Sequence, residues 1–360
     1  MIEMYDRAMR IHRDSIVVDC LTGTFSKDFN EQYVQNLKKG GISAIHVTIP
    51  DIESYDMSQV VDEFGKWFRV LRGLEQQNVR IATSVKDVRE IKEAGGIGVV
   101  LGSQGAGFLG LDLGRLHFFA RLGMRMWQAT YQQRNQIGGG CGEKVDVGLS
   151  NFGFKWVEEV NKLGIVISLS HVGYRTSMEV MESSKDPVVF DHSNAKALCD
   201  HIRNITDEQI RACAEKGGVI GLTPTGSFVS AEKKMSQIGV EDYVDHIDYV
   251  VDLVGVDHAG IGLDLCEGQF WTHEQLLEER RRLQEFLFTR TKQRQEVEDE
   301  FLKSERDKLY QYEVTMPWLK SVSEVPMITE NLLCRGYSNH DVKKIMGQNF
   351  LRVFERVWKS

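Results

Sequence analysis

The sequence predicts an α/β protein built as a closed (β/α)8 barrel of the TIM type, in one domain spanning residues 1–360. Short apolar runs rich in β-branched residues recur along the chain, and each is followed by a longer amphipathic stretch, which is typical of βα units around a parallel sheet. Eight such units occur, the number that closes a barrel of this type. Polar residues stand at the C-terminal end of nearly every run, where barrel enzymes place their active sites.

The predicted strands are short, and several follow glycines that would end the preceding helix, as in Gly40-Gly41, Gly95-Gly96 and Gly217-Gly218. A ninth run, Val79–Thr83, is also short and is expected to pair outside the main sheet. The eight strands of the barrel are predicted at Ser15–Asp19, Ile42–Thr48, Gly96–Leu101, Gly123–Gln128, Gly164–Leu169, Pro187–Asp191, Gly218–Thr223 and Ala259–Asp264.

An open, doubly wound sheet would show the same alternation, but it would place its ligand at a switch point beside a glycine-rich first turn. No G-x-G-x-x-G pattern follows the first run. The barrel is favoured because the polar residues at the strand ends would then all meet at one mouth. These residues are Asp19, His46, Gln104, Tyr131, His171, His192, Thr223 and Asp264.

Composition and charge exclude several classes of protein. A net charge of -8 argues against a broad nucleic-acid-binding face, which requires clustered positive charge. The six cysteines include no CxxC pair, so neither a zinc ribbon nor a disulfide framework is indicated. Residues 1–14 are charged, and no run is long enough to span a bilayer. We therefore expect a cytoplasmic protein with reduced thiols and no membrane contact.

Two helical segments are predicted after the eighth strand. Residues 272–312 contain no glycine or proline, which predicts a helical insertion. A solvated hairpin with ion pairs is one interpretation. The others are a lid over the barrel mouth, or a subunit contact made by Leu276, Leu277, Leu283, Phe286 and Phe288. Residues 339–358 are predicted to form a last amphipathic helix that packs on the barrel.

Two histidines end adjacent predicted strands. His171 closes the run Ser168-Leu169-Ser170-His171, and His192 follows Phe190-Asp191 at the end of the next strand. Side chains at neighbouring strand ends converge on the barrel axis, so the two imidazoles can bind one zinc ion. The structural alternative is a pair of hydrogen-bonded histidines that line the mouth. Two histidines in matching positions favour the metal site.

An acidic residue and an arginine complete the candidate chemistry. Asp264 ends the eighth strand and is a candidate metal ligand or general base, although a carboxylate at such a turn also commonly caps the next helix. Arg203 lies on the loop after the sixth strand, where its guanidinium could hold a substrate carboxylate. Spacing alone favours a surface ion pair for Arg203.

Several segments resemble the membrane (renal) dipeptidase family of the amidohydrolase superfamily, and the likeness covers most of the chain. Its clearest parts are Leu169-Ser170-His171-Val172, His192-Ser193-Asn194-Ala195, Cys199-Asp200-His201-Ile202-Arg203-Asn204, Thr206-Asp207-Glu208-Gln209, Gly217-Gly218-Val219-Ile220-Gly221, Gly260-Ile261-Gly262-Leu263-Asp264 and Gly347-Gln348-Asn349-Phe350.

The resemblance implies a hydrolase of small peptides or amides that uses two zinc ions joined by a glutamate and forms a dimer. By position, His171 and His192 match the ligands of one metal ion, and Asp264 matches an acid beside the other. Arg203 matches the residue that contacts the substrate carboxylate.

Four positions depart from the family pattern, and all would lie near the metals. Leu21 and Gly23 stand where the family has a histidine and an aspartate ligand, and Gln104 replaces the bridging glutamate. Tyr131 replaces a histidine that contacts the substrate. The first-strand metal would keep Asp264 alone, so we predict that this second ion is lost and that His171 and His192, with Gln104 as a possible third ligand, hold one zinc ion.

Together these observations predict a dipeptidase-like hydrolase of a small, carboxylate-bearing amide or peptide-like metabolite. Asp264 and Tyr131 are the predicted catalytic residues, and Arg203, Tyr131, Arg134 and Gln104 the predicted substrate-binding ones. A homodimer is expected. Two alternatives stay open: a lyase, decarboxylase or hydratase on the same barrel with one metal or none, and a non-catalytic protein that binds a small molecule. The glycine-rich segment 138–143 could close over the mouth as a flexible loop.

Overall fold

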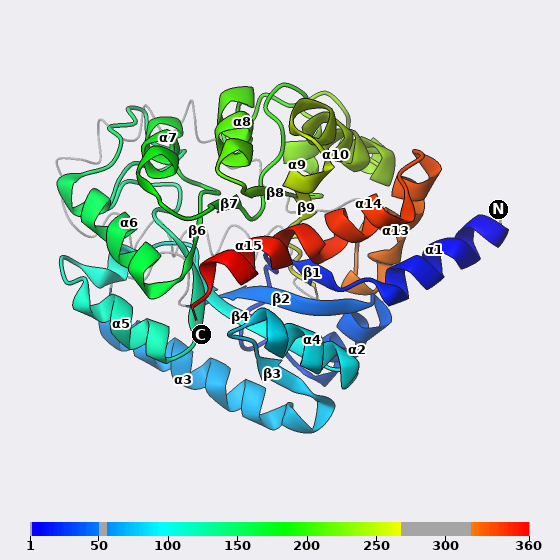
Figure 1. Cartoon of the computed structure of the whole chain (residues 1–360), viewed down its shortest axis with the longest axis horizontal. Coiled ribbons are helices and arrows are strands. Elements are labelled where there is room, and N and C mark those ends of the chain that lie inside the picture. Colours follow the sequence, from blue (N-terminus) through cyan, green and yellow to red (C-terminus); the bar gives the residue numbers. More distant parts are fainter. Residues whose placement is uncertain (1, 50–55, 268–317, 360) are drawn as a thin grey trace.

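A computed structural model describes residues 2–49, 56–267 and 318–359, and it shows a barrel of parallel strands with helices packed around it (Figure 1). The strand order is β1-β2-β4-β5-β6-β7-β8-β9. Cys20 N donates to Ile261 O over 3.1 Å and Asp264 N to Leu21 O over 2.8 Å, so the two ends of the sheet meet. The strands are β1 (Val17–Asp19), β2 (Ile42–Thr48), β4 (Ile97–Ser103), β5 (Met124–Gln128), β6 (Val166–Ser168), β7 (Val189–Phe190), β8 (Val219–Leu222) and β9 (Ala259–Ile261).

The predicted (β/α)8 barrel is confirmed, and each predicted strand falls on an observed one. The ninth run forms β3 (Val79–Ile81), which pairs in parallel with β4 but lies off the path of the barrel, as predicted. The helices connecting the strands are α2 (Glu31–Lys39), α3 (Met57–Gly73), α4 (Val85–Glu93), α5 (Gly114–Arg121), α6 (Asn151–Leu163), α7 (Tyr174–Ser183), α8 (Asp207–Glu215), the short α9 (Gly226–Val229) and α10 (Val240–Val254).

Local sequence signals set where these helices begin. Ser84 and Asp87 form a reciprocal capping box at the start of α4, and Thr206 and Gln209 form another at the start of α8. Each box satisfies backbone donors that the first helical turn leaves unpaired, which stabilises the helix start by about 1 kcal/mol. Helix α8 therefore begins at a fixed distance after β7, and the intervening loop carries Arg203.

Helices from the two ends of the chain pack together on the barrel. Helix α1 (Ile2–Asp14) contacts α13 (Pro326–Cys334). His12 joins them, because its Nδ1 lies 2.7 Å from Thr329 Oγ1 while its Nε2 lies 2.7 Å from Gly40 O. The imidazole is 2% exposed, so this contact belongs to the core.

The prediction of a single C-terminal helix over residues 339–358 is wrong in one respect. The segment divides into α14 (Asn339–Lys343), a π-helical turn (Lys344–Gln348) and α15 (Asn349–Val357). A Cβ at Gly347 would collide with the carbonyl oxygen of Ile16, so close packing of the turn against the start of β1 requires glycine there. Beyond the turn, Asn349 Nδ2 donates to Ala259 O over 2.8 Å and ties α15 to β9.

The predicted insertion at 272–312, with its five proposed apolar contacts, lies outside the described residues. Across 2–49, 56–267 and 318–359, no helix has both the length and the apolar character needed to cross a bilayer.

Candidate metal and substrate site

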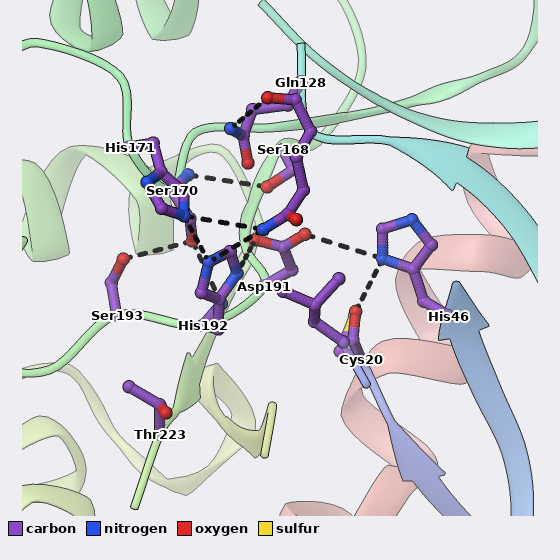
Figure 2. Close-up of polar contacts among 12 residues, drawn as sticks. Cys20, His46, Gln128, Ser168, Ser170, His171, Asp191, His192, Ser193 and Thr223 are labelled. Atoms are coloured by element: carbon purple, nitrogen blue, oxygen red, sulfur yellow. Dashed lines mark hydrogen bonds and ion pairs between the residues drawn. The ribbon is translucent and has the colours of Figure 1, made fainter. Parts of the chain in front are cut away.

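His171 and His192 meet at the C-terminal mouth of the barrel (Figure 2). They follow β6 and β7, and their Nε2 atoms lie 2.8 Å apart. Their exposed fractions are 5% and 0%. Two imidazoles held this close, away from solvent, can share a hydrogen bond or turn both nitrogens toward one ion.

Gln104 completes a group of three converging side chains. It follows β4, and its Nε2 lies 3.4 Å from His171 Nε2 and 3.3 Å from His192 Nε2. Thr48 donates to Gln104 Oε1 over 3.0 Å, and Gln128 Nε2 donates to the Gln104 backbone oxygen over 2.9 Å. Thr48 thus holds the side-chain amide, Gln128 holds the backbone of the same residue, and the amide faces both imidazoles.

His171 is aimed by an unusual backbone conformation. Its φ of +64° is in the left-handed region, which non-glycine residues rarely adopt and which is often found at functional sites. Cys141 N donates to His171 O over 2.7 Å, and the ring of Tyr131 stacks on the imidazole at 3.9 Å between centroids. Burial lowers the pKa of His171 well below its usual value, and the charges of Arg203 and His192 lower it further.

The glycine-rich segment is part of this support, contrary to the flexible loop that we expected. Gly139 N donates to Thr176 Oγ1 over 3.0 Å, and Gly173 N donates to Gly139 O over 2.9 Å. Gly140 pairs with Val172 in an antiparallel bridge. These bonds join the segment to the residues after β6, so it forms a wall of the site.

Arg203 is buried beside the histidines, so the surface ion pair favoured by spacing is wrong. Arg203 is 2% exposed, and one nitrogen of its guanidinium group donates to His192 O over 3.1 Å. The guanidinium also lies 5.3 Å from the centre of the Phe228 ring. Its buried Nε has no hydrogen-bond partner. Such a group can take a substrate carboxylate.

A cavity of about 320 Å³ opens next to Arg203 and His171. Its wall combines charged and apolar side chains, among them Arg203, His171, Lys196, Tyr174, Ile202 and Val172. Asp146 and Glu143 also line it, but Asp146 accepts hydrogen bonds from Gly148 N and Thr176 Oγ1, and Glu143 accepts one from Arg134 N. Lys144, Lys196 and Arg203 give the wall more positive than negative charge. The cavity therefore suits a small anionic molecule with an apolar part.

Asp264 and Arg134 occupy different environments. Asp264 follows β9 with a φ of +50°, close enough to His192 and Arg203 for their charges to lower its pKa, although burial is stronger and raises it. Arg134 is exposed and is not among the residues that line the cavity. The structure thus brings Asp264 toward the histidines and does not bring Arg134 there.

On the first-strand side of the mouth, the positions of Leu21 and Gly23 offer no metal ligand. Leu21 is fully buried, and the space beside Gly23 is filled by the thiol of Cys266, which donates to Gly23 O over 3.2 Å. Burial raises the pKa of Asp19 well above its usual value, and Asp19 Oδ1 accepts from Leu263 N over 2.8 Å. Within the described part of the chain, no three His, Cys, Asp or Glu residues are grouped to hold a metal ion.

The donor set therefore does not fit two ions. Two imidazole nitrogens and an amide oxygen are suitable donors for one zinc ion, provided the Gln104 amide rotates to present its oxygen, because amide nitrogen is not a ligand. A half-turn of the amide about its last side-chain bond exchanges the nitrogen and the oxygen without moving the backbone.

Two buried residues near the histidines have a larger part in the site than the sequence suggested. Asp191 Oδ1 lies 2.8 Å from His192 Nδ1, and Asp191 Oδ2 lies 3.6 Å from His46 Nδ1 (Figure 2). Burial opposes ionisation of Asp191, yet His192, His46 and Ser168 together hold its pKa well below its usual value. The sequence signal was the acid directly before His192, which is a common second contact of a metal-binding histidine.

Comparison with known proteins agrees with this architecture. A model of the membrane dipeptidase family, peptidase family M19, matches residues 6–299 and 312–359. The chain belongs to that family. The match confirms the family resemblance seen in the sequence.

Relatives and solved structures extend the likeness. Dipeptidase tcpJ of Claviceps purpurea is 28% identical over 79% of this chain and 56% of its own length. Dipeptidase verJ of Clonostachys rogersoniana is 26% identical over 77% of this chain and 60% of its own length. The chain thus matches little more than half of either relative. An amidohydrolase from Pseudomonas aeruginosa superimposes with a TM-score of 0.80, at 32% identity over 98% of this chain and 99% of its own.

Proposed function

We propose that this M19 chain is a dipeptidase-like, metal-dependent hydrolase of a small amide or peptide-like compound that carries a carboxylate. Its metal site would be reduced to one zinc ion, held by His171 and His192 with the amide of Gln104. The observation that carries the proposal is the convergence of these three side chains, 2.8 to 3.4 Å apart, beside the cavity lined by Arg203.

The residues around the zinc site divide the work of hydrolysis. A bound zinc ion supplies an activated water and polarises a carbonyl. Arg203, whose Nε is unpartnered, binds the substrate carboxylate and thereby sets the scissile bond in the cavity. Asp264, whose pKa is raised by burial, accepts a proton more readily near neutral pH and so acts as the general base. Tyr131 stacks on His171 and restrains the imidazole at the edge of the substrate site.

The direct test joins metal content to hydrolysis. Protein purified without chelator is analysed for zinc, manganese and iron, and a panel of dipeptides is assayed before and after chelation. We expect about one zinc per chain, loss of turnover on chelation and recovery with added zinc. His171→Gln and His192→Gln should remove bound zinc, whereas His12→Gln, a buried histidine far from the mouth, should keep it. Protein that binds none of these metals and gains no activity from them would overturn the proposal.

A second candidate function follows from the positions at the first strand. Leu21 and Gly23 leave the chain without the ligands of a second ion, so His171, His192, Tyr131 and Asp264 could act as acids and bases in a lyase, decarboxylase or hydratase. Turnover that survives complete chelation would favour this reaction class. Full biological activity of Asp264→Asn and His192→Ala variants would favour a non-catalytic binding protein. The homodimer and the cytoplasmic location stay predictions.

A further inference from the structure

A buried carboxylate connects the candidate zinc site to strand β2. Asp191 is 0% exposed and lies between two imidazoles, 2.8 Å from His192 Nδ1 and 3.6 Å from His46 Nδ1. Figure 2 shows this row of three side chains, with His192 toward His171 and His46 on the opposite side of Asp191. Asp191 is not among the residues that line the cavity, so substrate binding there does not account for it.

The contacts determine where the protons of the two site histidines lie. Asp191 Oδ1 lies 2.8 Å from His192 Nδ1, and a carboxylate oxygen accepts there, so the proton of His192 is on Nδ1 and its Nε2 carries a lone pair. His171 Nε2, 2.8 Å away, must then donate to His192 Nε2. The Nε2 lone pair of His192 therefore points to the place where His171 and Gln104 converge.

His46 lies on the other side of Asp191. Its Nδ1 donates to Cys20 O over 2.8 Å, and the same nitrogen lies 3.6 Å from Asp191 Oδ2, a buried oxygen without a hydrogen-bond partner. The ring fits there because β4 has glycine at position 102, where a Cβ would collide with His46 Nε2. Gly262 likewise leaves room for the backbone oxygen of Asp191, against which a Cβ at 262 would collide. Glycines at positions 102 and 262 thus leave the space that His46 and Asp191 occupy.

We propose that Asp191 is a positioning residue of the zinc site, which fixes the proton of His192 on Nδ1 and supplies, through that imidazole, negative charge that the neutral Gln104 does not. His46 is the second positioning residue, because it orients Asp191. The effect on zinc binding rests on the proposed function. The effect on the His192 proton does not, because it follows from contacts present without metal.

The physical reason is charge balance. A zinc ion bound by two neutral imidazoles and a neutral amide has no anionic ligand. A carboxylate that accepts a hydrogen bond from a metal-bound imidazole makes that imidazole a stronger donor, and loss of such a contact costs about 10- to 100-fold in metal affinity. Asp191→Asn keeps the size of the side chain and removes its charge. Because the N–H of His46 faces one end of that side chain, the Asn oxygen should turn toward His46 and its NH2 toward His192.

The test has one measurement that needs no metal. Long-range ¹H–¹⁵N NMR spectra of the metal-free protein report which ring nitrogen of each histidine carries the proton, and a His192→Gln variant identifies the His192 signals. We expect Nδ1–H in the wild type and a shift toward Nε2–H in Asp191→Asn. A wild-type His192 with its proton on Nε2 would overturn the proposal, even if no variant folds.

Zinc affinity, measured by competition with a chromophoric chelator, is the second measurement. Asp191→Asn should bind zinc about 10- to 100-fold more weakly than the wild type, and Asp191→Glu should recover part of the loss. The control is Asp87→Asn, which removes a half-buried carboxylate from the capping box of α4 and should lower Tm alone. Equal zinc affinities of wild type and Asp191→Asn would contradict the charge argument. A wild type that binds no zinc would instead contradict the proposed function and leave the NMR result decisive for Asp191.

Discussion

Replacing Gln104 with glutamate tests how the amide faces the two histidines. In the metal-free protein the amide nitrogen lies 3.3 Å from the Nε2 lone pair of His192, to which a carboxylate cannot donate, although it could accept from His171 Nε2. One lost contact costs about 1 kcal/mol, and burial of a charge adds about 2 kcal/mol. For a chain of 360 residues, about 3 kcal/mol lowers Tm by about 4 °C.

Zinc should reverse this effect. A carboxylate interacts with another unit charge at about 4 Å by about 4 kcal/mol at an effective dielectric constant of about 20. Desolvation offsets much of that, and a remaining gain of about 2 kcal/mol corresponds to zinc binding about 30-fold tighter than in the wild type. Gln104→Glu should therefore have a lower Tm than the wild type in chelator and a higher Tm in excess zinc.

The assay is thermal unfolding of both proteins in chelator and in zinc, together with a zinc titration. Gln128→Glu is a matched control. Gln128 is also buried and its Nε2 makes two donor contacts, of 2.9 and 2.8 Å, but both go to backbone oxygens. It should lower Tm in both conditions without tighter zinc binding. If Gln104→Glu bound zinc no more tightly than the wild type, the inferred arrangement of the three converging side chains would be refuted.

Three further perturbations give separate tests. Gly23→Ala should destabilise the protein by about 1–3 kcal/mol, because its Cβ would meet the thiol of Cys266; in urea unfolding, Cys266→Ala should recover most of that loss, and additive costs would argue against the contact. Burial lowers the pKa of His12 below 6.5, so the stability that neutral His12 provides above that pH is lost as the pH falls below it. In His12→Gln, the free energy of unfolding should therefore change less steeply between pH 7 and 5, by up to about 1.4 kcal/mol per pH unit. An unchanged slope would contradict this. Arg203→Lys should raise KM for carboxylate-bearing dipeptides about 10- to 100-fold with little change in kcat; an equal loss on substrates lacking the carboxylate would point to a structural role instead.

Much of this protein could be predicted from local patterns in its sequence. The alternation of apolar runs with amphipathic stretches placed the strands of the barrel, because burial on both faces of a parallel strand demands such runs. His171, His192 and Gln104 could be assigned to one mouth for the same reason, since parallel strands of a barrel end on one side. The departures at Leu21 and Gly23 were also visible in the sequence.

Contacts between distant segments could not be predicted in this way. Spacing favoured an exposed Arg203, but the loop that follows β7 turns it inward against His192 O and the Phe228 ring. The C-terminal helix shows an apolar periodicity without a break, and its interruption at Gly347 arises only because that turn packs on Ile16. The apolar periodicity of a helix does not show which distant segment of the chain packs against that helix.

The sequence by itself determined the barrel, the family and the residues missing from the two-metal pattern, because each is written in strand periodicity or in a motif. Tertiary structure decided what those losses mean. Cys266 from the eighth βα loop fills the space beside Gly23, and Asp191 lies within hydrogen-bonding distance of His192 while facing His46 from β2. These partners are brought together only by closure of the barrel. The charge beside His192, the position of its proton and the space beside Gly23 therefore follow from the fold as a whole.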